Sequence, residues 1–150
     1  MIIGYLRVST TQQDIENQRH VILDYANRNK KSGIEFVEIQ ISSRKNLDDR
    51  LINQLVDRLN AKDTLIVTEL SRIGRSVSEV TTIVKQLIEK DVRLICIKEN
   101  INTSKANDIN TKVIITMFSL LSELERDLIS MRTKEALETR KKMGVTLGRP

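Results

Sequence analysis

The sequence predicts an α/β fold: an open, mostly parallel sheet with helices on both faces, followed by one long C-terminal helix. Four short apolar runs lack clean polar alternation, which is typical of strands covered on both faces. They alternate with helical patterns, as in parallel sheets with right-handed crossovers. The expected strands are Ile2–Val8, Ile34–Ile39, Thr64–Thr68 and Val92–Ile97, and the expected helices are Thr11–Asn29, Leu47–Asn60 and Val77–Glu89.

Two of these helices begin with capping-box spacing. Thr10 is followed by Gln13, and Ser76 by Glu79. In a capping box each side chain satisfies a backbone donor that the helix start leaves unpaired. We therefore expect Thr10 to be a cap without a chemical role, which leaves its neighbour Ser9 available for chemistry.

The last third of the chain predicts a single long helix. Positions 107–143 contain no Pro or Gly. At 1.5 Å per residue such a helix extends about 50 Å, which is more than a small α/β domain spans. Part of its apolar face must therefore be covered by something other than its own core, either a second copy of the chain or a partner protein. The apolar stripe comprises Val113, Met117, Leu121, Leu124, Leu128 and Met131.

The end of this helix is also marked. Gly144 follows a basic last turn, Arg140, Lys141 and Lys142, and this arrangement favours a C-terminal cap. We expect 1–106 to form the α/β domain and 107–143 the long helix. The remaining positions, 144–150, resemble the start of a linker to a further domain.

Composition limits the classes of function. The chain has 150 residues, 39% hydrophobic and 30% charged, as in one soluble globular domain. Its 25 Lys and Arg exceed its 20 Asp and Glu, which is compatible with a nucleic-acid partner. Aromatic residues are only 3%, with no Trp, so base stacking on aromatic side chains is not expected.

The location of the protein is predicted from what its sequence lacks. The single cysteine, Cys96, lies in an apolar run and is interpreted as a small core residue in a reducing compartment. No signal-peptide pattern opens the chain, and no apolar run approaches the roughly 20 residues that span a bilayer. We expect a cytoplasmic protein without a membrane segment.

Arginines gather where ligands bind in such folds, beyond the carboxyl ends of the strands. Their guanidinium groups match phosphate oxygens, and four of them without carboxylates repel one another unless an anion is bound. Each arginine alone is compatible with an ordinary solvated residue, whereas the set favours a phosphate site. The polar residues at this edge are Arg7, Ser9, Gln13, Arg44, Ser71, Arg72 and Arg75.

The candidate chemistry is phosphoryl transfer by a serine. The only histidine, His20, falls within a predicted helix, and no metal-binding or Walker spacing occurs. Attack by Ser9 in an arginine-rich pocket depends on positioning and charge neutralisation, and it yields a covalent phosphoserine ester.

Three segments resemble motifs of the serine recombinases, the resolvase/invertase family. They are YLRVSTTQQ, followed by Gln18, then ELSRIGRS, and then ELERDLISMRT. The family's opening motif is Y-x-R-V-S, its second block L-D-R-L-G-R-S, and its third A-E-R-x-x-I-x-x-R-T. The blocks keep the family's order and approximate spacing over essentially the whole chain.

The resemblance implies roles for individual residues. Ser9 attacks the scissile phosphate and forms a 5′-phosphoserine linkage with a free 3′-hydroxyl. Glu125 matches an acid with a structural role, and Tyr5 a motif tyrosine for which packing beneath the site is at least as good an interpretation. Residues that match family site residues are Arg7, Arg72, Arg75, Arg44, Gln13, Gln18, Arg126 and Arg132.

The resemblance also implies partners. These are double-stranded DNA, a homodimer in solution and a tetramer at synapsis, with neither metal nor small-molecule cofactor. The basic helix end, Arg140, Lys141 and Lys142, is placed to contact the DNA backbone or minor groove. A solvated helix end is an equally good interpretation of those three residues.

Two features depart from the family. Ser71 stands where the family usually has an aspartate. Glu69 would share a strand face with Ser71 if the strand continued here, and it is a candidate substitute for that acid. The family's separate DNA-binding domain is also missing, so we expect a fragment of a longer recombinase.

Two other classes of protein remain as alternatives. One is a non-catalytic DNA-binding or dimerisation protein that retains the fold, supported only by Ser71. The other is a receiver-like phosphate-binding domain, which predicts acids at the end of the first strand, where this chain has Arg7 and Ser9.

Overall fold

A five-stranded sheet with the strand order β2-β1-β3-β4-β5 forms the centre of the molecule. The computed structural model describes residues 1–8, 12–40, 45–103 and 109–144. The first four strands pair in parallel, and β5 pairs antiparallel with β4. The elements are β1 (Ile2–Val8), α1 (Gln12–Arg28), β2 (Ile34–Gln40), α2 (Lys45–Arg58), β3 (Thr64–Val67), η1 (Leu70–Arg72), α3 (Val77–Glu89), β4 (Arg93–Cys96), β5 (Ile101–Asn102) and α4 (Ile109–Lys142).

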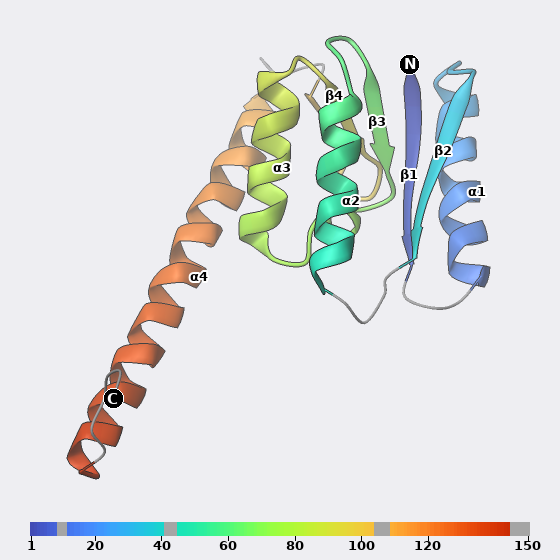
Figure 1. Cartoon of the computed structure of the whole chain (residues 1–150). Helices are drawn as coiled ribbons and strands as arrows, with labels where there is room; N and C mark the ends of the chain where they lie inside the picture. The colour runs from blue at the N-terminus through green and yellow to red at the C-terminus, as the bar shows by residue number, and fades with distance from the viewer. Residues whose placement is uncertain (9–11, 41–44, 104–108, 145–150) are drawn as a thin grey trace.

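Helices cover both faces of the sheet, as predicted. Helix α1 lies on one face, and α2 and α3 lie on the other (Figure 1). Successive side chains of a strand point to opposite faces. On β1, Tyr5 therefore belongs to the core cluster with α2 and α3, while Leu6 packs with Ile22 of α1. This double burial explains the nearly continuous apolar runs in the sequence.

The end of the sheet contains elements that the sequence analysis missed. Strand β3 ends at Val67, and a 3₁₀ turn, η1, follows it. Strand β4 ends at Cys96, and the chain reverses through Asn100, whose φ is 53°. Asparagine tolerates this left-handed conformation better than most residues. The two-residue β5 is too short for any periodicity to predict it.

Helix α3 begins as its sequence predicts. The Ser76 hydroxyl accepts a hydrogen bond from the Glu79 backbone N–H at 3.2 Å. The Glu79 carboxylate in turn accepts from the backbone N–H of Arg75 at 2.7 Å, one residue before the cap. Thr10, the other predicted cap, lies outside the described residues.

Helix α4 is one continuous helix of 34 residues. Its first part packs against α3, and the remainder extends beyond the α/β body (Figure 1). Helix α4 ends at Lys142. Gly144 follows with a φ of 80° and an N–H that donates to the Lys141 carbonyl at 3.0 Å, which confirms the predicted cap. Within the described residues, no helix is long and apolar enough to cross a membrane.

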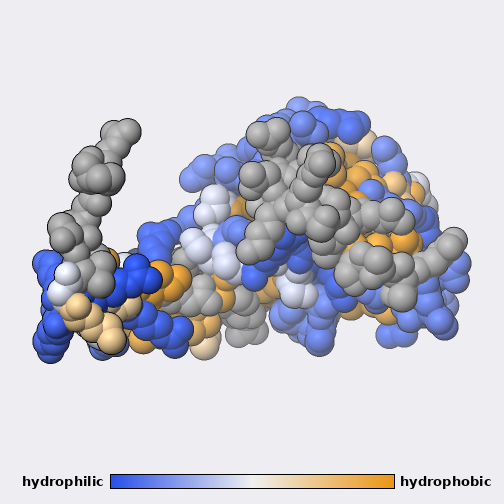
Figure 2. All heavy atoms as spheres, turned by 60° about the horizontal axis from the view of Figure 1, so that its bottom comes forward, coloured by the Kyte–Doolittle hydropathy of each residue, from blue (hydrophilic) through white to orange (hydrophobic). Residues whose placement is uncertain are grey.

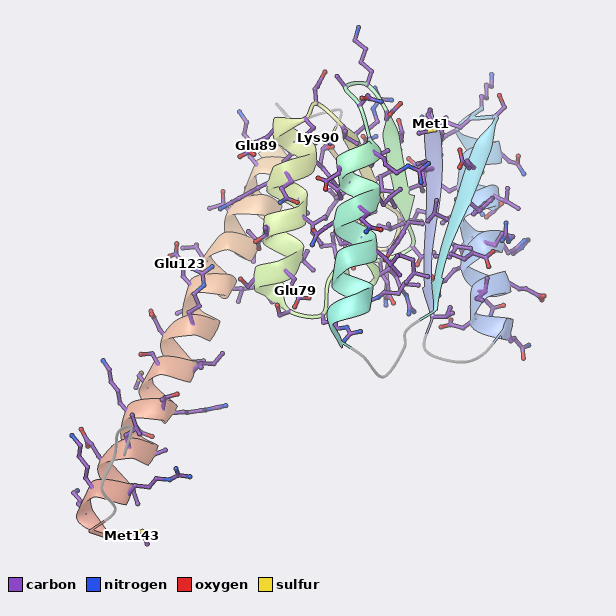
Figure 3. All side chains as sticks on the ribbon, viewed as in Figure 1. Met1, Glu79, Glu89, Lys90, Glu123 and Met143 are labelled. Atoms are coloured by element: carbon purple, nitrogen blue, oxygen red, sulfur yellow. The ribbon has the colours of Figure 1, made fainter. Side chains whose placement is uncertain are left out.

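The apolar stripe of α4 is largely uncovered. Its six members, from Val113 to Met131, are 45–57% exposed. Figure 2 shows apolar patches among charged ones along this helix. Figure 3 shows side chains on the distal half of α4 extending into open space, with Met143 near its end. A single chain therefore leaves this surface without a core to enter.

Candidate active site

The crevice for a ligand lies where the strand order reverses, between the carboxyl ends of β1 and β3. Arg7 is the penultimate residue of β1, and η1, which contains Arg72, follows β3 by two residues. Glu79 lies at this edge, opposite Met1 at the amino ends of the strands (Figure 3). The predicted convergence of Arg7 and Arg72 is observed.

Arg7 connects β1 to the segment after β3. Its Nη2 atom donates hydrogen bonds to the backbone carbonyls of Ser71 and of Gly74, the latter at 3.3 Å. Gln18 fixes the Arg7 backbone from the other side. Its side chain accepts from the Arg7 N–H at 3.3 Å and donates to the Arg7 carbonyl at 3.1 Å. Gln18 is 4% exposed, so this reciprocal pair is shielded from water.

Arg72 lies beside the end of β1 and is paired with carboxylates. Its Nη1 donates to the Arg7 carbonyl at 3.3 Å and lies 3.8 Å from Asp14, while Nη2 lies 2.9 Å from Glu69. The expectation of arginines without carboxylates was therefore wrong, because Glu69 offsets part of their repulsion. Among the described residues, the buried Nε of Arg72 has no hydrogen-bond partner.

Glu69 bridges two cations. One oxygen pairs with Arg72 and the other lies 2.8 Å from Lys98. The hydrogen bond from Lys98 is the main reason that the pKa of Glu69 is lowered, with the Ser71 hydroxyl and the charge of Arg72 adding to it. The expectation that Glu69 and Ser71 share a strand face was wrong, because β3 ends before them. A carboxyl held ionised in this way orients an arginine but is a poor proton donor.

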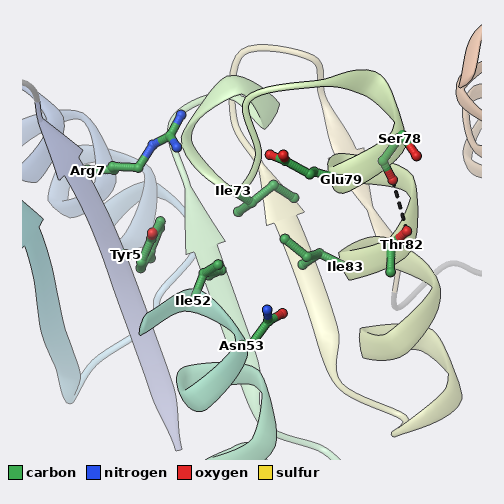
Figure 4. Close-up of a pocket in the computed structure, with 9 residues that line it drawn as sticks. All are labelled: Tyr5, Arg7, Ile52, Asn53, Ile73, Ser78, Glu79, Thr82 and Ile83. Atoms are coloured by element: carbon green, nitrogen blue, oxygen red, sulfur yellow. Dashed lines mark hydrogen bonds between the residues drawn. The ribbon is translucent and has the colours of Figure 1, made fainter. Parts of the chain in front are cut away.

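A cavity of about 170 Å³ opens beside Arg7 (Figure 4). Tyr5, 1% exposed, lies beneath Arg7 on β1, which agrees with the packing interpretation of this tyrosine. Arg75 is exposed immediately before the α3 cap. The cavity is lined by Tyr5, Arg7, Ile52, Asn53, Ile73, Ser78, Glu79, Thr82 and Ile83.

Among the described side chains of the long helix, that of Arg126 contacts this region. Arg126 donates from Nη2 to the Ser78 hydroxyl in the first turn of α3, at 3.4 Å. The other predicted basic residues of α4 are exposed on its distal part, which one chain does not bring to Arg7. They are Arg132, Arg140, Lys141 and Lys142.

Three predicted residues cannot be placed beside the arginines. Ser9 and Arg44 lie outside the described residues, and so does the side chain of Glu125. Gln13 is exposed in the first turn of α1. The structure therefore describes the frame around Ser9: Arg7 and Val8 before it, and α1 after it.

Other ionisable groups do not form a metal centre in the described part of the chain. No cluster of three or more His, Cys, Asp or Glu side chains occurs there. His20 is exposed on α1, as expected for a surface residue. Cys96 belongs to the core, which confirms the predicted core position. Burial, followed by the neighbouring Glu99 carboxylate, raises the pKa of its thiol. It therefore stays protonated.

Comparison with known proteins identifies the family. Residues 2–146 match the family described as "Resolvase, N terminal domain". The chain belongs to the resolvase family. A resolvase of Clostridium perfringens is 36% identical over 151 residues, which covers 100% of this chain and 77% of that protein. The predicted membership of the serine recombinases is thereby confirmed, and with it the predicted enzyme class.

Solved structures support the same conclusion for the fold. A resolvase family site-specific recombinase from Streptococcus pneumoniae superposes with a TM-score of 0.68 at 26% identity, covering 94% of this chain and 97% of that one. The N-terminal catalytic domain of TP901-1 integrase gives a TM-score of 0.61 at 26% identity, with 85% and 97% covered. The predicted α/β architecture of this resolvase-family chain is confirmed.

Sequence analysis missed the residues that hold the arginines in place. Asp14, Lys98 and Glu99 surround η1, yet they come from α1 and from the turn after β4. Nothing in their spacing indicates this convergence. The family motif includes Arg72 but not these partners.

Gly74 is the first residue at which the site can be tested. A Cβ built on it lies 2.8 Å from the backbone nitrogen and a side-chain carbon of Val80. Gly74→Ala must therefore push the η1–α3 segment away from α3. We expect a loss of about 1–3 kcal/mol in the free energy of unfolding, as for overpacked sites, measured by urea denaturation. Ser32→Ala, at an exposed position after α1, is the control for an alanine without close contacts. Unchanged stability in Gly74→Ala would contradict the close packing.

Glu69 predicts a pH-dependent contribution to stability. Because its folded-state pKa lies below the ordinary 4.5, ionised Glu69 stabilises the fold above that pH. This contribution is lost as the pH falls through the lowered pKa. Glu69→Gln should therefore lose stability near neutral pH and show a shallower decline in acid, measured by denaturation across pH. Exposed Glu35→Gln is the matched control. Equal slopes for the parent and Glu69→Gln would refute the assignment.

Proposed function

We propose that this chain is the catalytic part of a site-specific recombinase that cleaves and rejoins double-stranded DNA through a 5′-phosphoserine at Ser9. The observation that carries the proposal is the joining of Arg7 and Arg72 at the carboxyl end of β1, two residues before Ser9. The structural relative TP901-1 integrase is described as a catalytic domain, which supports an active role.

The chemistry follows from this arrangement. The Ser9 oxygen attacks the phosphorus, the bond to the 3′-oxygen breaks, and the released 3′-hydroxyl takes up a proton. The phosphoserine ester keeps the bond energy, so attack by a 3′-hydroxyl reverses the step and rejoins DNA without an added energy source. Arg7 and Arg72 stabilise the charge on the phosphate oxygens. Arg44, Arg75 and Arg126 complete the positive surroundings in this proposal.

Two glutamines and one acid support these groups. Gln18 holds the Arg7 backbone, so the strand end before Ser9 has a fixed course. Gln13, in the first turn of α1, is assigned a place near the nucleophile from its motif. Glu69 takes the orienting role of the family's aspartate, in place of Ser71, through its 2.9 Å contact with Arg72. Glu69→Gln should therefore slow cleavage, and an unchanged rate would remove Glu69 from the site.

The experiment that tests the function is the capture of a covalent adduct. The protein is mixed with a supercoiled plasmid library of genomic fragments, and protein–DNA complexes that survive denaturation are sequenced. We expect an adduct at the 5′ end of the break, and we expect Ser9→Ala to abolish it. Ser32→Ala, an exposed serine after α1, should leave the adduct unchanged. An adduct that survives Ser9→Ala refutes the assignment. The absence of any adduct favours the non-catalytic alternative.

We also propose that two chains pair through α4 and that dimers form a tetramer at synapsis. The support is the apolar stripe, which a single chain leaves about half exposed. Apolar surface of this extent on a helix beyond its own core is stabilised by burial against another helix. In such a dimer, Arg132 lies close enough to the second chain to contribute to a site that the two chains share.

Leu124 is the sharpest test of this pairing. It is 57% exposed on the stripe, so Leu124→Glu leaves a single chain folded but places a charge in the proposed interface. We expect the dimer to dissociate at least about tenfold more readily, since 1.4 kcal/mol corresponds to a factor of ten. Sedimentation equilibrium measures this change. Ser130→Glu introduces the same side chain on another side of α4 and should not alter association. If Leu124→Glu dimerises with the same affinity as the parent, the apolar stripe is not the dimer interface.

The remaining assignments concern the distal helix and the location. We propose that 1–106 are the catalytic domain and that 107–143 serve dimerisation and DNA contact. Arg140, Lys141 and Lys142 are exposed in the last turn of α4, where they are available to phosphates. We also propose that a protein that acts on DNA in this way is cytoplasmic.

A further inference from the structure

Glu99 connects the turn between β4 and β5 to the 3₁₀ turn that contains Arg72. Its carboxylate accepts the backbone N–H of Leu70 through both oxygens, at 3.2 and 3.3 Å. Leu70 is the first residue of η1 and is 4% exposed. The preceding residue, Glu69, makes no side-chain cap of η1. Glu99 thus satisfies a donor that the start of η1 leaves unpaired, from a position 29 residues away in the chain.

The turn that carries Glu99 is itself fixed against the strand that precedes η1. The N–H of Ile97 contacts the Val67 carbonyl at 3.1 Å, and the N–H of Lys98 contacts the Thr68 carbonyl at 2.9 Å. These bonds continue the β3–β4 pairing beyond its last paired residues. The Cys96 thiol also donates to a Glu99 oxygen at 2.7 Å. The Glu99 carboxylate is therefore fixed by its own turn and by Cys96, in addition to its hydrogen bonds with Leu70.

The other end of the η1 segment is held by Arg7. Its guanidinium donates to the Ser71 and Gly74 carbonyls, so the segment lies between a carboxylate at its start and a guanidinium at its end. The same β4–β5 turn supplies Lys98, which holds Glu69, and Glu69 holds the Arg72 guanidinium. Residues of the β4–β5 turn therefore fix both the backbone on which Arg72 lies and the position of its side chain.

We propose that Glu99 is a positioning residue for DNA cleavage: by capping Leu70 it sets the placement of η1 and hence of the Arg72 guanidinium against the scissile phosphate. The proposal rests on the function proposed above and deepens it. Glu99 touches neither Ser9 nor DNA in this scheme. Glu99 affects the rate of the chemical step, whereas the affinity for DNA depends on the basic surface.

The size of the effect follows from geometry. Loss of the cap leaves the buried Leu70 N–H unpaired, and the chain must move to satisfy it. A shift of about 1 Å in a positioned group lowers a reaction rate by as much as about 100-fold. We expect a fall in the rate of adduct formation of about 10- to 100-fold, with DNA affinity nearly unchanged, because backbone contacts to DNA do not depend on this displacement.

Two substitutions separate the cap from the charge. Glu99→Gln keeps an oxygen that can accept from Leu70 at the same reach, but it removes the charge. Glu99→Asp keeps the charge, but its side chain is one methylene too short to make the contact. The cap predicts that Glu99→Gln cleaves close to the parental rate and Glu99→Asp cleaves slowly. A purely electrostatic role predicts the reverse order, which would overturn the proposal.

The matched control for general destabilisation is Thr103→Val. The Thr103 hydroxyl accepts from the Leu94 backbone N–H at 2.7 Å, another buried side-chain-to-backbone bond in the β4–β5 region, but it does not reach η1. We expect this variant to lose stability without slowing the chemical step. Adduct formation is measured in single turnover at saturating protein, on the plasmid isolated with the parent, alongside DNA affinity at the same salt concentration and urea denaturation.

The outcomes distinguish the positioning role of Glu99 from the proposed nucleophilic role of Ser9. If Ser9→Ala still forms the adduct, the proposed nucleophile is wrong whatever Glu99 does. If Ser9→Ala abolishes the adduct while Glu99→Asp cleaves like the parent, only the positioning role is refuted. Slowing by Thr103→Val to the same degree as by Glu99→Asp would also refute it, since the effect would then reflect stability alone.

Discussion

The arrangement of the site depends on the Arg7 guanidinium, which joins the end of β1 to backbone carbonyls 64 and 67 residues further along the chain. The sheet places these segments side by side, because β1 and β3 are parallel neighbours. A charged donor that satisfies two carbonyls fixes their separation more firmly than a neutral one would. The reciprocal bonds of Gln18 then prevent the strand end from turning. Arg7, two residues before Ser9, is thus held by the same network that holds η1.

Carboxylates make this concentration of positive charge compatible with a stable fold. Glu69 lies between Arg72 and Lys98, and Glu99 caps the turn on which Arg72 lies. Each acid is partly withdrawn from water and accepts hydrogen bonds, and for Glu69 the hydrogen bond from Lys98 lowers the pKa of the carboxyl. The buried Nε of Arg72 has no acceptor within the described residues. Glu69 therefore neutralises only part of the positive charge of Arg7, Arg72 and Lys98.

The long helix has a different relation to the domain. Only its first part packs against α3, and Arg126 reaches Ser78 in the first turn of that helix. Helix α3 begins two residues after Arg75, so the element that contacts α4 is also the one that follows the arginine segment. The exposed stripe, which extends from Val113 to Met131 on both sides of Arg126, is compatible with a second chain that covers it.

Sequence alone determined the alternation of strands and helices and the Ser76 and Gly144 caps, because apolar runs and caps are local patterns. It also determined the gathering of Arg7 and Arg72, because the carboxyl ends of parallel strands lie at one edge of a sheet. It also gave the family, through motifs around Ser9, Arg72 and Arg126. Only the tertiary structure decided that β3 stops before η1 and that Glu69 and Glu99 hold Arg72. These residues are separated along the chain and follow no period, so their contacts arise only when the sheet brings its strand ends together.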